Sequence, residues 1–367
     1  MSERRVRVET LSQSYDVIIG SGLLADAGRL VSEVCSADRI AVVTDANVAE
    51  LFGQRLVAQV ASKGFELHPL TVAAGEASKS WEVVGQLLEA FASLGISRTD
   101  AVMALGGGVV GDLAGFAAAA YLRGVDFIQV PTTLLAQVDS SVGGKTGVDL
   151  RAGKNLAGAF KQPLVVLADT DTLLSLPESE WRSGLAEVAK SAVISGEEFL
   201  RWLEARTEQL SVRETGVTAD TVQRCVEFKS SVVSTDEREE GVRECLNYGH
   251  TLAHAIEKVA GYGVVSHGAA VAEGIRFASR LAVEVLGAPR EFVARQDALL
   301  DRLGLNGLES VWSVDELLSA MHSDKKAREG RIRFVLADAA GSWRCEAVDD
   351  VKVREHLTAW AASKGGN

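Results

Sequence analysis

The hydrophobic pattern of the chain changes character once, near Pro177. Before that point, short apolar runs alternate with stretches of helical period, which is the pattern of a parallel sheet with helices on its faces. Strict alternation over 6–9 and 16–19 predicts an additional hairpin at the edge of this sheet. The remaining predicted strands cover residues 39–44, 67–72, 101–105, 127–131 and 164–168.

After Pro177, apolar positions recur with helical period through most of the chain. Residues 332–336 and 342–347 are the exception and predict a late hairpin. We therefore expect an α/β domain of the Rossmann-like, NAD-binding type over 1–177, an all-α metal- and substrate-binding domain over 178–367, and a site in the cleft between them. The predicted amphipathic helices cover 184–206, 218–235, 246–260, 268–286, 290–303 and 314–322.

Composition supports two folded domains, because 367 residues exceed one ordinary core and 47% are hydrophobic against 24% charged. The net charge of −12 argues against nucleic acid or an anionic membrane as a partner of the whole surface. No apolar run predicts a transmembrane helix or a secretory signal, so we expect a cytoplasmic protein. The cysteines lack a C-x-x-C pair, which favours reduced thiols.

A glycine-rich segment follows the strand predicted at 101–105 and opens a predicted helix. Gly106, Gly108 and Gly111 match G-x-G-x-x-G in this context, where backbone N–H groups and the positive helix end receive a pyrophosphate. A tight turn that needs glycine only for packing is the alternative. Asp126 stands about 20 residues on, where the motif requires an acid. It precedes the next strand, however, so we do not assign it to the ribose.

A second glycine-rich stretch, 141–146, ends like a P-loop. Asp139 stands where a P-loop requires glycine, so ATP binding is not supported. Lys145 beside Gly143 and Gly144, followed by 153–155, predicts an anion cradle in glycine-rich turns, with solvated loop lysines as the alternative. Together with the candidate metal ligands, these cations indicate a substrate with more than one negative charge. The second domain adds Lys190, Lys229, Arg243, Lys325 and Lys326.

A glutamate and three of the six histidines form a candidate metal site. Two imidazoles and a carboxylate suit a catalytic zinc, which keeps one position open for substrate or water. Glu187, His250 and His267 are one such set. Helical spacing instead makes both His250 and His254 ligands, with Glu187 or His267 as the third. A buried structural histidine is the alternative for each, and the sequence alone does not choose between His254 and His267.

Six motifs together resemble those of the 3-dehydroquinate synthase family, a group of sugar-phosphate cyclases. They occur in family order, and the block from 129 to 160 is the most specific. The resemblance implies a homodimeric lyase of the shikimate pathway, in aromatic amino acid biosynthesis. It would convert 3-deoxy-D-arabino-heptulosonate 7-phosphate, a phosphorylated seven-carbon sugar acid, to 3-dehydroquinate and phosphate with NAD and Zn²⁺, or Co²⁺. The motifs cover 106–112, 121–125, 129–147, 153–160, 184–190 and 246–257.

The resemblance also implies residue roles. The metal ligands would be Glu187, His250 and His267, leaving His254 for hydrogen bonding or proton transfer. NAD would meet Asp45 and Glu76 at the ribose, Lys79, Gly107, Gly108 and Asp112 at the pyrophosphate, Thr132, Thr133, Asp139 and Lys154 toward the nicotinamide, and Thr172 and Leu173 beside it. The substrate phosphate would meet Lys145, Asn155, Lys326 and Arg123. Of these, Lys145 would also contact NAD, and Arg123 would reach across a dimer interface. The substrate carboxylate and hydroxyls would meet Lys190, Lys229, Arg243 and Asn247, and Asp139 is also counted as catalytic.

The implied reaction is a transient oxidation by NAD, phosphate elimination, reduction and an intramolecular aldol closure. Three alternatives remain at this stage. A metal-dependent alcohol dehydrogenase of the glycerol dehydrogenase type shares the plan but gives no reason for so many cations. A sibling cyclase acting on an amino or valiolone-type substrate is closer. An NAD-binding sensor without activity is expected to lose a ligand, and none is lost.

The sequence departs from the family pattern directly after His267. The family more often has an acid immediately after His-Gly, where this chain has Ala269. The family has no acid at the position where this chain has Glu273. Neither position is in the implied ligand set, so the departure concerns local packing.

Overall fold

The computed structural model describes residues 3–323 and 331–364. The chain folds into two compact units, one of Met1–Pro177 with Thr218–Glu237 and the other of Glu178–Val217 with Arg238–Asn367. The boundary after Pro177 lies where the hydrophobic pattern changes. We expected residues 218–237 in the second unit, but they pack with the first.

The contacts of helix α9 (Thr215–Thr235) explain this difference. The Ser230 hydroxyl donates to the main-chain oxygen of Arg7 at 3.0 Å, and Lys229 donates to the main-chain oxygen of Asp139 at 2.7 Å. An amphipathic pattern shows that a helix has a buried face. It does not show which part of the chain that face contacts, so the expected range 178–367 was wrong for this helix.

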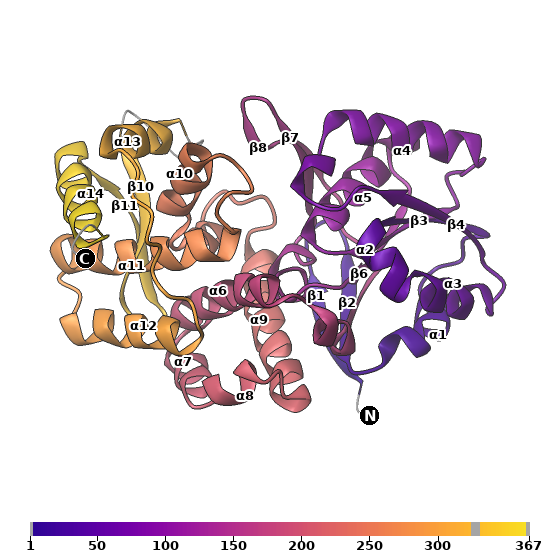
Figure 1. Cartoon of the computed structure of the whole chain (residues 1–367). Helices are drawn as coiled ribbons and strands as arrows, with labels where there is room; N and C mark the ends of the chain where they lie inside the picture. Colours follow the sequence, from indigo (N-terminus) through magenta and orange to yellow (C-terminus); the bar gives the residue numbers. More distant parts are fainter. Residues whose placement is uncertain (1–2, 324–330, 365–367) are drawn as a thin grey trace. The chain divides into compact units, whose positions relative to one another are not determined.

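The first unit is built on a seven-stranded sheet in the order β1-β2-β9-β6-β5-β3-β4 (Figure 1). Only β1 and β2 are antiparallel, and they form the predicted edge hairpin. All predicted strands of this sheet are confirmed, with ends that shift by no more than two residues. The strands are β1 (Arg4–Glu9), β2 (Ser14–Gly20), β3 (Arg39–Asp45), β4 (Glu66–Val72), β5 (Ala101–Gly106), β6 (Asp126–Pro131) and β9 (Val165–Asp169).

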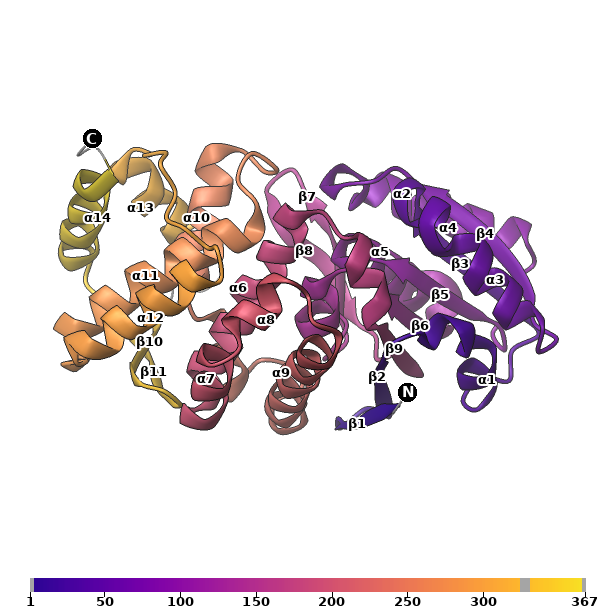
Figure 2. The same ribbon diagram turned by 60° about the horizontal axis from the view of Figure 1, so that its bottom comes forward.

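Helices cover both faces of this sheet (Figure 2). Helices α1 (Ala27–Ser32) and α3 (Gln54–Ala61) pack on one face, and α4 (Trp81–Ser93) and α5 (Gly108–Ala120) pack on the other. Strand β5 is buried along its whole length, and its successive residues enter the two apolar clusters alternately. Burial on both faces explains why β5, β9 and most of β3 are continuous apolar runs.

A hairpin of β7 (Lys145–Leu150) and β8 (Gly153–Phe160) occupies the segment that we expected to form glycine-rich turns. That expectation was wrong, because the glycines here serve close strand pairing. A Cβ on Gly147 would lie 2.7 Å from the main-chain oxygen of Ala157, and one on Gly158 would lie 2.1 Å from that of Thr146. Glycine lowers the strand signal of a sequence while permitting such close approach.

The described part of the second unit is helical with one antiparallel hairpin, β10 (Ile332–Ala339) and β11 (Ser342–Val348), which the sequence predicted. The expected description of this domain as all-α therefore leaves out the hairpin. The helix expected over 184–206 is broken at Gly196, whose φ of 137° does not continue a helix. Helix α14 was not expected. The helices are α6 (Glu178–Ser195), α7 (Glu197–Glu204), α8 (Thr207–Ser211), α10 (His250–Ala260), α11 (His267–Leu286), α12 (Arg290–Arg302), α13 (Val314–His322) and α14 (Asp350–Lys364).

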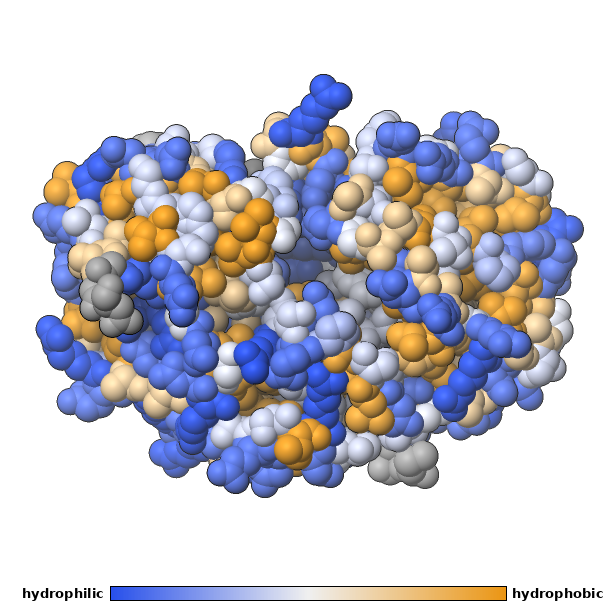
Figure 3. All heavy atoms as spheres, viewed as in Figure 1, coloured by the Kyte–Doolittle hydropathy of each residue, from blue (hydrophilic) through white to orange (hydrophobic). Residues whose placement is uncertain are grey.

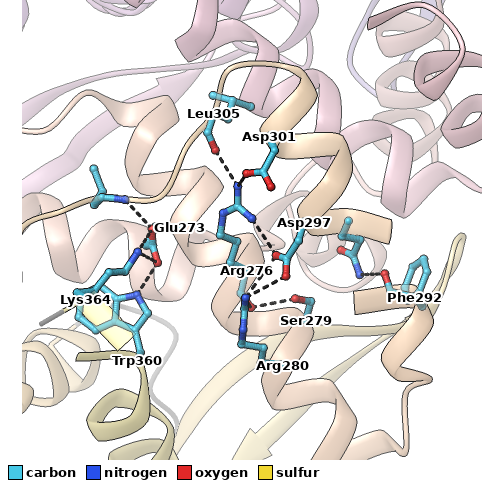
Figure 4. Close-up of polar contacts among 12 residues, drawn as sticks. Glu273, Arg276, Ser279, Arg280, Phe292, Asp297, Asp301, Leu305, Trp360 and Lys364 are labelled. Atoms are coloured by element: carbon cyan, nitrogen blue, oxygen red, sulfur yellow. Dashed lines mark hydrogen bonds and ion pairs between the residues drawn. The ribbon is translucent and has the colours of Figure 1, made fainter. Parts of the chain in front are cut away.

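The buried acid Glu273 ties the C-terminal helix α14 to α11 (Figure 4). Its carboxylate accepts hydrogen bonds from the Trp360 indole, from Lys364 at 2.9 Å and from the main-chain N–H of Leu308 at 3.0 Å. One turn along α11, Arg276 donates to Asp297 and other acceptors. The departure from the family pattern at Glu273 therefore has a structural role.

Hydrophilic and apolar side chains are interspersed on the face drawn in Figure 3. Among the described residues, the helices are too short or too polar to cross a membrane.

Candidate active site

The glycine-rich turn joins the carboxyl end of β5 to the N-terminus of α5. Gly107 occupies the N-cap position without a side-chain hydrogen bond, so the first N–H groups of α5 have no side-chain cap. A Cβ on Gly107 would lie 2.9 Å from Thr133 Cγ2, and one on Gly106 would lie 2.6 Å from Val110 Cβ. Glycine thus permits close packing and leaves an uncapped helix end suited to a phosphate.

Asp45 ends strand β3, the neighbour of β5 in the sheet. The chain continues from β3 to β4 on one side and returns to β5 on the other, so β3 and β5 flank the topological switch point, where α/β sheets bind ligands. Asp45 Oδ1 accepts from the main-chain N–H groups of Asn47 and Val48. Asp126, by contrast, pairs with Ala101 at the opposite end of β5, which excludes it from this edge.

The buried Lys79 side chain contacts the half-buried Asp112 and the exposed Asn155 beside the first turns of α5. Lys79 Nζ lies 2.5 Å from Asp112 Oδ2 and 2.5 Å from Asn155 Oδ1. Burial would lower the pKa of Lys79, but the charge of Asp112 outweighs it and raises that pKa. Nearby, Lys154 Nζ lies 3.2 Å from Glu76 Oε1. The structure therefore brings together five residues that the resemblance had divided between NAD and the substrate phosphate.

The segment after β6 carries Thr132, Thr133 and Asp139. Thr132 donates its main-chain N–H to Gly106 at 2.9 Å. Asp139 forms a short ion pair with Lys229. Thr172 and Leu173 follow β9, the neighbour of β6, and both are buried. These residues thus gather at the carboxyl edge of the sheet, although Thr172 already donates its hydroxyl to the main-chain oxygen of Asp169.

Glu187, His250 and His267 meet in the second unit, where one ligand atom from each lies within 4.8 Å of the others. Glu187 Oε1 is 3.0 Å from His267 Nε2 and 3.5 Å from His250 Nε2. His254 is not part of this group, and its ring stands edge-on to that of His250 with centroids 5.4 Å apart. The helical spacing of His250 and His254 therefore does not make both of them members.

Close helix packing brings these three residues together. His250 is the first residue of α10, His267 is the first of α11, and Glu187 lies within α6. A Cβ on Gly274 would lie 1.8 Å from the main-chain oxygen of Gly249, and one on Gly268 would lie 2.3 Å from Ser183 Cα. Glycine at these positions lets the α10 and α11 segments, and the α11 and α6 backbones, approach closely.

The group combines an ionised carboxylate with two imidazoles. Burial would raise the pKa of Glu187, but Lys190, whose Nζ is 2.5 Å from Oε2, and the two imidazoles hold it well below its usual value. Burial lowers the pKa of His250 to about 4. Burial also acts to lower the pKa of His267, but Glu187 and Glu257 outweigh it and raise that pKa to about 10. An ionised carboxylate beside two imidazole nitrogens is a donor set that fits Zn²⁺.

The remaining predicted substrate contacts are distributed over both units. In the first, Lys145 is the exposed first residue of β7, and Arg123 lies in an exposed turn with a φ of 69°. In the second, Arg243 is only 1% exposed, and Asn247 donates to Glu239 at 2.9 Å. Lys326 lies outside the described residues.

The sequence profile of the 3-dehydroquinate synthase N-terminal region matches residues 69–183, and that of the C-terminal region matches residues 184–327. The chain belongs to the 3-dehydroquinate synthase family. A 3-dehydroquinate synthase of Caulobacter vibrioides (strain NA1000 / CB15N) is 45% identical over 345 residues, which cover 92% of this chain and 93% of the relative.

Two solved structures share the fold. A 2-deoxy-scyllo-inosose synthase in complex with carbaglucose-6-phosphate, NAD⁺ and Co²⁺ has a TM-score of 0.88 at 26% identity, covering 96% of this chain and 99% of its own. A 2-epi-5-epi-valiolone synthase from Streptomyces hygroscopicus subsp. jinggangensis 5008, with NAD⁺ and Zn²⁺ bound, has a TM-score of 0.87 at 29% identity, covering 98% and 100%. The two-domain fold class predicted from the sequence is confirmed.

Proposed function

We propose that the protein is a 3-dehydroquinate synthase that converts 3-deoxy-D-arabino-heptulosonate 7-phosphate to 3-dehydroquinate and phosphate in the cytoplasm. The observation that carries the proposal is the grouping of Glu187, His250 and His267 within a chain whose two halves both match this family. The likeness to relatives that bear this name, at 45% identity, favours it over the sibling cyclases, at 26% and 29%.

The proposed cofactors are NAD and a divalent metal, Zn²⁺ or Co²⁺, as in the two solved relatives. When bound, the metal lowers the pKa of coordinated hydroxyls and NAD accepts and returns a hydride. Glu187, His250 and His267 would hold the metal. The residues that would hold NAD are Asp45, Glu76, Lys79, Gly107, Gly108, Asp112, Thr132, Thr133, Asp139, Lys145, Lys154, Thr172 and Leu173.

The cationic side chains would bind and orient a substrate with several anionic groups. A buried guanidinium such as that of Arg243 is held in place before the substrate arrives, so its charge stabilisation costs little reorganisation. His254, whose ring contacts that of His250, would move a proton. The phosphate would meet Lys145, Asn155, Arg123 and Lys326, and the carboxylate and hydroxyls would meet Lys190, Lys229, Arg243 and Asn247.

The fate of the hydride distinguishes the two reaction classes. A synthase returns the hydride from the reduced cofactor to its own product, whereas a dehydrogenase leaves it on the cofactor as NADH. Substrate deuterated at carbon 5 should give product that retains the label, with one phosphate released per turnover and no steady build-up of NADH. Mass spectrometry, a phosphate assay and absorbance of NADH measure these quantities. NADH accumulating in proportion to substrate consumed, without phosphate release, would establish an alcohol dehydrogenase instead. Faster turnover of the amino analogue would assign the chain to a sibling cyclase.

A homodimer with Arg123 reaching into the partner's site is the assembly that we propose. Leu122 and Arg123 both adopt left-handed backbone conformations, with φ of 50° and 69°, and Leu122 is 40% exposed. Two such residues in succession store strain that a functional contact explains. Trp81, at 62%, is a further exposed large apolar side chain of this unit.

Subunit complementation tests this assembly. Arg123→Ala and His250→Ala should each have little activity alone, because one lacks the phosphate contact and the other lacks a metal ligand. Co-refolded mixtures should regain about a quarter of wild-type activity, because about half of the dimers are mixed and each mixed dimer holds one complete site. A mixture that stays inactive while sedimenting as a dimer would place Arg123 outside the partner's site.

A further inference from the structure

Glu257 is a buried acid that none of the roles above uses. It lies on α10 two turns after His250, on the same face of that helix. Its side chain is 3% exposed. Burying a carboxylate is costly unless it is paired or hydrogen-bonded, so a buried acid beside a candidate metal site requires an explanation.

The explanation lies at the second ring nitrogen of His267. Glu257 Oε1 is 3.4 Å from His267 Nδ1, while Nε2 of the same ring faces Glu187 Oε1 at 3.0 Å. The His267 side chain is thus held between two carboxylates from different helices, one at each nitrogen. It is 30% exposed, so packing alone does not fix its ring orientation.

The second histidine of the group has the same arrangement with a neutral partner. His250 Nδ1 lies 3.1 Å from the main-chain oxygen of Tyr248, and its Nε2 lies 3.5 Å from Glu187 Oε1. In both rings an acceptor at Nδ1 would keep a proton on that nitrogen when a metal displaces the proton from Nε2, so the Nε2 lone pair would serve the metal. The two rings differ in that His250 meets a carbonyl and His267 meets a negative charge.

We propose that Glu257 is a positioning residue that fixes the tautomer and orientation of His267 and makes its Nε2 a stronger metal donor. This inference rests on the metal site of the proposed function. It assigns the two carboxylates separate tasks, since Glu187 would bind the metal directly and Glu257 would act only through His267. The partly exposed His267 is the ligand that gains most from such a partner.

Metal titration of the metal-free protein tests the proposal. Glu257→Gln keeps the size of the side chain and removes its charge, so it should weaken Co²⁺ and Zn²⁺ binding about 10–100-fold, as loss of an outer-shell partner does. Glu273→Gln is the matched control, because Glu273 is equally buried in the same unit and contacts Trp360 and Lys364 (Figure 4). It should leave metal affinity unchanged.

A second measurement reads the tautomer directly. Nitrogen-15 spectra of histidine-labelled, metal-loaded protein should show His267 protonated at Nδ1 in the wild type, with a changed Nδ1 signal in Glu257→Gln. If Glu257→Gln does not fold by circular dichroism, Glu257→Asp, which keeps the charge on a shorter stem, should show an intermediate loss of affinity.

The outcomes separate this inference from the metal site itself. Weak metal binding by His267→Ala together with wild-type affinity and an unchanged Nδ1 signal in Glu257→Gln would overturn the role of Glu257 and leave the site intact. Wild-type metal binding by His267→Ala would instead overturn the proposed ligand set.

Discussion

Replacing His250 or His267 by alanine should abolish metal binding and activity together. Each change removes one of only three protein donors, so metal affinity should fall by more than about 100-fold, the upper end of what loss of an outer-shell partner costs. His254→Ala should retain the metal and lose about 10²–10⁴-fold in turnover, the usual contribution of a general acid or base. Metal analysis of the purified variants and steady-state phosphate release measure the two effects.

The His254 variant is the control for this experiment. His254 lies one turn from His250 on the same helix, and the two rings are in contact. If the substitutions acted only by disturbing α10, the His250 and His254 variants would both lose metal. A metal-free His254→Ala protein beside a zinc-loaded His267→Ala protein would reverse the ligand assignment and restore the helical pair that spacing first indicated.

Lys190→Ala should strongly destabilise the metal-free protein. The Lys190 and Glu187 side chains are 3% and 1% exposed, and their charged atoms lie 2.5 Å apart. Removing one partner of a buried ion pair typically costs about 3–5 kcal/mol, and the loss should lie toward the lower end because His267 still lies 3.0 Å from Glu187. Zinc should restore more stability to this variant than to the wild type, because the bound cation takes over the neutralisation of Glu187. Urea denaturation with and without zinc measures both differences.

An exposed helical ion pair in the same unit supplies the control. Arg201 and Glu197 stand four residues apart on α7, with side chains 75% and 41% exposed. Arg201→Ala should lower the free energy of unfolding by only about 0.3–0.5 kcal/mol and should not respond to zinc. Equal losses in the two variants would show that burial of the Glu187–Lys190 pair has no special energetic role.

The strands of the seven-stranded sheet could be predicted from the sequence because their signals are local. Parallel strands buried on both faces must be continuous apolar runs, and all such runs before Pro177 became strands. The glycine spacing over 106–111 likewise indicates a tight turn from a strand into a helix. The family motifs added the set of residues for the site.

Other features depend on contacts between distant segments, and only the tertiary structure decided them. The sequence alone could not show that His267, and not His254, groups with Glu187 and His250, because this grouping depends on how closely α6, α10 and α11 pack. Glycines between these helices permit the close packing. For the same reason α9 was assigned to the wrong unit, and β7 and β8 were mistaken for turns. Hydrophobic periodicity determines that a face is buried, whereas the identity of its partner is settled by the long-range packing that also places Glu257 beside His267.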